Sequence, residues 1–119
     1  KQRILNAKFY DKEFSKIKEI KIPPRPSNYK IVYHLYIIFA KNRDKLLKYC
    51  LDRGIEAKVH YPKPMYLQKS QKDLKHKKGD FPTTDIHAKN IITFPCDQHL
   101  SKRELEHVVL TVKKFYKNN

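Results

Sequence analysis

The spacing of the apolar residues changes twice along this 119-residue chain, and these changes constrain the fold more than any other feature. Between Leu5 and Ile17 apolar residues recur every three or four positions, which predicts an amphipathic helix over residues 2–20. The same spacing returns after Ser101, where Ser101 and Glu104 form the S-x-x-E pattern of a helix capping box. The chain between them is rich in β-branched and aromatic residues. These patterns predict helices at both ends, with a small sheet between them.

Two segments in the middle of the chain predict strands. Residues 29–39 carry apolar side chains at both odd and even positions, which is typical of a central strand covered on both faces. Residues 55–61 alternate between apolar and polar side chains, which predicts a half-buried strand. Between the two lies a predicted helix over 43–53, with Asn42 as its N-cap and Gly54 where the chain needs a positive φ.

The remaining segments are shorter. Three prolines predict an extended connector over residues 21–28, because proline lacks the backbone N–H that a helix or strand needs. Residues 66–79 predict a polar loop with one helical turn, followed by a short helix that ends near Asn90 and a brief strand at 92–94. The predicted fold class is therefore α+β, with a small, largely antiparallel sheet packed with helices.

The charge of the chain leaves two interpretations open. Its formal net charge is +15, which could attract nucleic acid or another anionic surface. However, only five of the 27 basic residues are arginine, and the lysine-rich segment 69–78 contains no aromatic residue on which a base could stack. We favour a solvated face and expect neither a nucleic-acid nor a membrane partner. A free-standing basic binding module is the alternative.

The two cysteines, Cys50 and Cys96, are too few for a disulfide framework and lie in or beside apolar segments. We expect buried free thiols and a reducing, cytoplasmic location, since no apolar run is long enough for a membrane span. The two isolated glycines exclude the usual phosphate-binding loops, and no second pair of residues at metal-ligand spacing accompanies Cys96 and His99. We therefore expect no metal site.

The stretch Val59–Gln68 is the strongest candidate for a functional site. A predicted strand brings His60 and Tyr61 to a turn made rigid by two prolines, and this turn holds Tyr66 and Gln68 close to the strand end. Polar groups that converge at one edge of a domain commonly form ligand sites. The same groups could instead satisfy one another structurally, and convergence alone does not choose between these readings.

At this stretch the sequence resembles the C-terminal domain of the DegT/StrS family of sugar aminotransferases, and the likeness runs nearly end to end. The family motifs occur here in the family's order. They are His34-Leu35-Tyr36, Arg43-Asp44, Gly54-Ile55, His60-Tyr61-Pro62, Gly79-Asp80-Phe81-Pro82, Thr93-Phe94-Pro95 and Leu100-Ser101.

The resemblance implies the small domain of a pyridoxal-phosphate enzyme of fold type I. Residues 1–28 would then be a helix and proline-rich connector leading from a large domain, and residues 29–119 the small domain itself. In the family the large domain carries the cofactor on a lysine and takes an amino group from glutamate for transfer to a keto-sugar, in polysaccharide or other amino-sugar biosynthesis. No catalytic residue is expected in this chain. The implied protein is a homodimer.

The same resemblance implies which residues bind substrate. They would form one wall of the substrate cleft, and they are His34, His60, Tyr61, Tyr66 and Gln68. Many relatives have histidine where this chain has Tyr66, so the substrate is expected to differ from the common nucleotide-linked hexoses. Met65-Tyr66 and residues 95–99 are similar to the branch that aminates an eight-carbon octulosonate sugar. A regulatory remnant that keeps the domain without the chemistry is a third reading.

Overall fold

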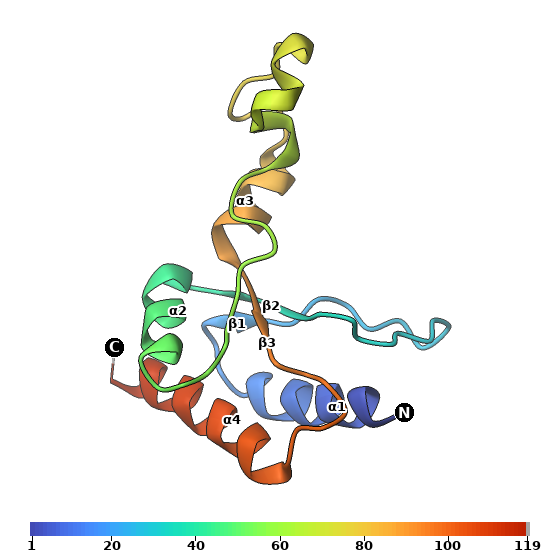
Figure 1. Ribbon diagram of the computed structural model, residues 1–119, viewed down its shortest axis with the longest axis vertical. Helices are drawn as coiled ribbons and strands as arrows, with labels where there is room; N and C mark the ends of the chain where they lie inside the picture. The colour runs from blue at the N-terminus through green and yellow to red at the C-terminus, as the bar shows by residue number, and fades with distance from the viewer. Residues whose placement is uncertain (119) are drawn as a thin grey trace.

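The computed structural model describes residues 1–118, which form one small sheet with helices packed around it and a long arm that projects from it (Figure 1). The molecule measures 48 × 37 × 24 Å. Its elements in chain order are α1 (Gln2–Phe14), β1 (Ile20–Lys21), β2 (Tyr36–Ala40), α2 (Arg43–Leu51), the 3₁₀ helices η1 (Met65–Leu67) and η2 (Lys69–Leu74), α3 (Pro82–Asn90), β3 (Ile91–Phe94) and α4 (Lys102–Lys117).

The three strands form an antiparallel sheet in the order β1-β2-β3. Ile20 pairs with Ala40 at one edge of β2, and Tyr36 pairs with Phe94 at the other. The predicted α+β class with a small antiparallel sheet is confirmed, and the strand predicted to be central is the central one. None of the helices formed by residues 1–118 is both long and apolar enough to cross a membrane.

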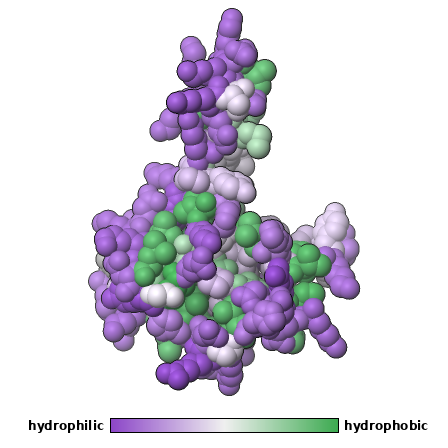
Figure 2. All heavy atoms as spheres, in the orientation of Figure 1, coloured by the Kyte–Doolittle hydropathy of each residue, from purple (hydrophilic) through white to green (hydrophobic). Residues whose placement is uncertain are grey.

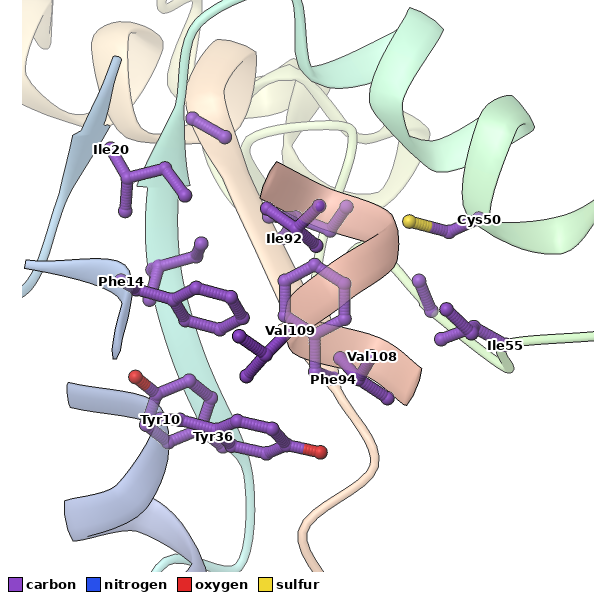
Figure 3. Packing of buried hydrophobic residues seen from close by; sticks show 14 of the residues in the cluster. Tyr10, Phe14, Ile20, Tyr36, Cys50, Ile55, Ile92, Phe94, Val108 and Val109 are labelled. Carbon is purple, nitrogen blue, oxygen red and sulfur yellow. The ribbon is translucent and has the colours of Figure 1, made fainter. Parts of the chain in front are cut away.

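The core lies between the sheet and the helices α1 and α4 (Figure 3). Phe14 of α1 packs on Tyr36 and Phe94, with ring centroids 6.3 and 5.6 Å away. A second link between the two helices is ionic, because Glu13 accepts hydrogen bonds from Lys16 and from Lys113 of α4. These hydrogen bonds lower the pKa of Glu13 from 4.5 to about 2.

The C-terminal helix forms as its sequence predicts. The Ser101 hydroxyl accepts from the Glu104 N–H at 3.3 Å, and the Glu104 carboxylate accepts from the Ser101 N–H at 2.7 Å, which completes the capping box. The apolar stripe of this helix is buried. The core also contains both cysteines as free thiols, and burial raises the pKa of Cys50 to about 12 and that of Cys96 to about 11.

The first helix is shorter than predicted. It ends at Phe14 rather than near residue 20, and the chain then makes two turns through hydrogen bonds from Ile17 to Phe14 and from Ile20 to Ile17. Ile20 and Lys21 then pair with β2 as a strand, which neither the predicted helix nor the predicted connector anticipated. The helical spacing of the apolar residues continues past Phe14, but strand pairing with a distant segment decides their conformation.

The strand predicted over 29–39 is also shorter, because only Tyr36–Ala40 has neighbours to pair with. The preceding residues form an extended side loop, and Tyr29 and Val32 are 68% and 63% exposed. The predicted helix 43–53 is confirmed in position and ends at Leu51. Gly54 has the predicted positive φ of 73°, whereas the Asn42 side chain makes no capping hydrogen bond.

The polar loop predicted over 66–79 is the outer part of the arm, which comprises residues 61–90. The arm contains the 3₁₀ helices η1 and η2, whereas the prediction had one helical turn here. The chain returns to the sheet through α3, which is the predicted short helix that ends near Asn90. Hydrophilic side chains cover most of the arm, whereas larger apolar patches appear on the rest of the molecule (Figure 2). The lysine-rich segment 69–78 is part of this exposed surface.

Candidate functional site

The candidate site begins where residues 55–60 are attached to β3. Ile55 and Ala57 are buried as the predicted alternation requires. However, the segment is not a strand in the sheet: Lys58 and Thr93 form an isolated antiparallel bridge, with N–H···O distances of 3.1 and 2.8 Å. The predicted strand over 55–61 is therefore wrong in extent, because the chain turns outward into the arm and carries Tyr61 away from the core.

His60 is held at this bridge by its side chain. Its Nδ1 lies 2.9 Å from the Thr93 Oγ1, which lies 3.0 Å from the Lys58 carbonyl oxygen. Thr93 is 4% exposed, so the contact lies at the edge of the core. Within residues 1–118, the half-buried imidazole forms one described hydrogen-bond contact, through its Nδ1, and its ring also packs edge-on against that of Tyr61 at 5.5 Å.

Three of the five predicted site residues line one hollow of about 200 Å³ at the base of the arm: His60, Tyr61 and Gln68. The hollow is open, since Tyr61 is 72% exposed and Met65, beside it, is 73% exposed. Its opposite wall comes from the end of α3 and the start of β3, and includes His87, whose ring stacks on Phe39 of β2 at 4.5 Å. The hollow combines an imidazole, a phenol and an amide, which can all form hydrogen bonds with a polyhydroxylated ligand.

The structure places Tyr66 outside the lining of this hollow. Its hydroxyl donates to the Asp85 Oδ1 at 2.5 Å, and the other oxygen of Asp85 accepts from the Gly79 N–H at 3.0 Å. The Tyr66 ring packs on Phe81 at 4.8 Å. Desolvation and the hydrogen bond to Asp85 raise the pKa of Tyr66. These contacts hold the two sides of the arm together.

His34 lies apart from the other predicted residues. It belongs to the side loop and lines a second hollow of about 590 Å³ with Lys1, Arg3, Lys30 and Gln98. This surface is basic and lies beside the start of α1, and its lining does not include His60. The predicted substrate-binding set is thus divided between the base of the arm, the interior of the arm and the side loop.

Sequence reasoning did not assign a role to Thr93 or to His87. A signal for Thr93 was present, because a threonine between two apolar residues of a buried strand must place its hydroxyl against a polar partner. His87 carried no such signal. Helical spacing alone could not show that α3 would lead back to the sheet at the base of the arm and bring this side chain to the hollow.

The fold of this chain is found within a larger known structure. The crystal structure of DesV from Streptomyces venezuelae, in complex with a ketimine intermediate, superimposes with a TM-score of 0.92 at 23% identity. The match covers 98% of this chain and 31% of DesV. Residues 1–113 match the profile of the DegT/DnrJ/EryC1/StrS aminotransferase family, and the chain belongs to this family.

Two relatives are each several times longer than the segment that matches this chain. The chain is 30% identical over 112 residues to the erythromycin biosynthesis sensory transduction protein EryC1 of Saccharopolyspora erythraea, covering 94% of this chain and 31% of the relative. It is 26% identical over 84 residues to the dTDP-3-amino-3,4,6-trideoxy-alpha-D-glucose transaminase of Streptomyces venezuelae, covering 71% of this chain and 22% of the relative. The chain thus spans about a third or less of these proteins.

The residues of this chain do not fit a cofactor cage. The hollow at the base of the arm is lined by one lysine, Lys63, which is exposed, and the exposed Tyr61 leaves the hollow open to solvent. Residues 1–118 contain no cluster of three or more histidine, cysteine, aspartate or glutamate side chains that could hold a metal ion.

Proposed function

We propose that this chain is the small C-terminal domain of a pyridoxal-phosphate-dependent sugar aminotransferase, which transfers an amino group from glutamate to a keto-sugar in amino-sugar biosynthesis. The observation that carries the proposal is the family match over residues 1–113. It favours an aminotransferase over a free-standing basic binding module. In this proposal residues 1–28 lead in from the large domain and residues 29–119 form the small domain, although α1 also packs in the shared core.

The cofactor would supply the electron sink for amino transfer and would be held by the large domain. The residues of this chain would bind and orient the sugar. The Tyr61 hydroxyl and the Gln68 amide can each donate and accept hydrogen bonds, and both lie at the open side of the hollow next to His60. Because the Tyr66 hydroxyl already donates to Asp85, it would meet a sugar hydroxyl as an acceptor.

The proposal includes a homodimeric, cytoplasmic enzyme. Burial of both cysteines as free thiols is compatible with a reducing compartment. The octulosonate branch stays a prediction that rests on Met65-Tyr66 and residues 95–99. His34 stays in the proposed substrate set as a residue of the side loop, where it would meet a different part of the ligand from His60.

A regulatory protein is the second candidate, because the relative EryC1 is named for sensory transduction. The two candidates are separated by purifying a longer protein that contains this chain. An aminotransferase binds pyridoxal phosphate, which is visible as a yellow colour, and moves ¹⁵N from labelled glutamate to a keto-sugar. Cofactor binding without transfer to a panel of keto-sugars favours the regulatory candidate. Failure to bind pyridoxal phosphate contradicts the proposed enzyme.

A further inference from the structure

Thr93 contacts two partners, and together these contacts bear on which nitrogen of His60 carries the proton. The Thr93 Oγ1 lies between two partners, the Lys58 carbonyl oxygen at 3.0 Å and the His60 Nδ1 at 2.9 Å. The hydroxyl has one proton to give, and a carbonyl oxygen can only accept. The contact with Lys58 is therefore attractive only if Thr93 donates to it.

This arrangement leaves the Thr93 oxygen as an acceptor toward the imidazole. If the Nδ1 of His60 carried no proton, the single Thr93 proton could serve either Lys58 or His60 but not both. The other contact would then bring two lone pairs together at about 3 Å. One arrangement of protons makes both contacts attractive: Thr93 donates to Lys58, and the Nδ1–H of His60 donates to Thr93. In a neutral imidazole the second nitrogen, Nε2, then has a free lone pair.

The free nitrogen can reach a ligand. Within residues 1–118, every buried side-chain nitrogen and oxygen atom has a hydrogen-bond partner. The described hydrogen bonds of His60 involve Nδ1 and not Nε2, so Nε2 is not a buried atom. His60 lines the hollow at the base of the arm together with Tyr61 and Gln68. Its Nε2 is the atom left to face a ligand there.

We infer that Thr93 is a positioning residue that holds neutral His60 as the Nδ1–H tautomer, so that Nε2 accepts a hydrogen bond from a hydroxyl group of the substrate. A bare nitrogen attracts a donor and repels the oxygens of a carboxylate or phosphate, so this point of the site favours a hydroxyl group over either anion. The sugar part of the inference rests on the proposed function, whereas the tautomer does not.

The tautomer is tested on this chain with ¹⁵N-labelled histidine, using two-bond ¹⁵N–¹H correlation spectra at a pH where His60 is neutral. A His60→Gln variant assigns the His60 signals. We expect the pattern of a protonated Nδ1 and a bare Nε2. The opposite pattern in the unmodified chain overturns the inference, whether or not the longer protein is an enzyme.

Substitutions at position 93 show whether Thr93 is the cause. Thr93→Val keeps the β-branched shape but removes the hydroxyl, and we expect the His60 signals to shift toward the Nε2–H form. Thr93→Ser restores the hydroxyl and should restore the Nδ1–H pattern. Thr111→Val is the matched control, because Thr111 is similarly buried at 6% exposure but lies on α4. Unchanged His60 signals in Thr93→Val contradict the positioning role.

The acceptor role is tested by kinetics in the longer protein. In Thr93→Val the sugar hydroxyl can no longer donate a hydrogen bond to a bare Nε2 of His60. We expect loss of this bond to raise KM for the keto-sugar about three- to tenfold, with kcat and the KM for glutamate nearly unchanged. Thr93→Ser should remain close to the unmodified protein. If the tautomer changes in Thr93→Val and KM for the sugar does not, Nε2 is not the acceptor. Absence of any amino transfer refutes the proposed function and leaves the tautomer result standing.

Discussion

The body of the molecule and its arm are stabilised in different ways. The body, formed by the sheet with α1, α2 and α4, contains a continuous cluster of buried apolar side chains. In the arm, no residue of η1, η2 or α3 is buried. The arm is held instead by the aromatic contacts around Tyr66 and by the hydrogen bonds that Asp85 accepts. Because the arm buries so little apolar surface, we expect its local unfolding to cost less free energy than unfolding of the core.

The hollow lies where these two regions meet. His60 is anchored to the body through Thr93, whereas Gln68 belongs to the arm. Arg43 of α2 ties the two regions together: it is 7% exposed, and its guanidinium donates to the backbone oxygens of Ile91 at 2.6 Å and of Ala88 at 3.0 Å. The hollow therefore has one wall attached to the buried core and another on a segment whose helices contain no buried residue.

The largest effect is expected in the body, from Phe14→Ala. Phe14 is fully buried, so its loss removes apolar contacts and leaves a cavity, which costs about 3–5 kcal/mol of the free energy of unfolding. Urea unfolding followed by circular dichroism measures this cost. Leu5→Ala on the same helix is the control, because Leu5 is 54% exposed and its loss should cost no more than about 0.5 kcal/mol. Equal costs would refute the description of α1 as a core helix.

An intermediate effect is expected at the junction, from Arg43→Met. The change removes the donors that serve Ile91 and Ala88 while keeping an aliphatic chain, and we expect a loss of about 1–3 kcal/mol. Hydrogen exchange should become faster in α3 than in α4. Arg103→Met, at an exposed position of α4, is the control. If α3 keeps its protection in Arg43→Met, then Arg43 does not tie the arm to the body.

The smallest effect on global stability is expected in the arm, from Asp85→Asn. The amide that replaces the carboxylate cannot accept from both Tyr66 and Gly79 with the same strength, because charge-assisted hydrogen bonds are the stronger kind. We expect a change in the free energy of unfolding of about 0.5 kcal/mol or less, with faster exchange of the Gly79 amide. Asp73→Asn in η2 is the control. Faster exchange in β2 would show that the arm and the body are a single cooperative unit.

The sequence determined the elements whose signals are local. The capping box of Ser101 and Glu104 predicted the start of α4, because both partners lie within one turn of the same helix. The helical spacing from Leu5 onward predicted α1, and Gly54 was predicted to have positive φ because few other residues adopt it easily. The α+β class follows from such signals taken together. The family motifs are also read directly from the sequence.

Tertiary structure decided where the strands end and which side chains meet. Ile20 continues a helical pattern but pairs with Ala40, since a strand forms only where a neighbour supplies hydrogen bonds. Tyr66 was grouped with His60 because a turn with two prolines was expected to hold it close to the strand end. Instead its hydroxyl donates to Asp85 within the arm, while Thr93, 33 positions from His60, contacts the imidazole. Sequence spacing governs contacts along one element, whereas contacts between elements depend on how the whole chain packs.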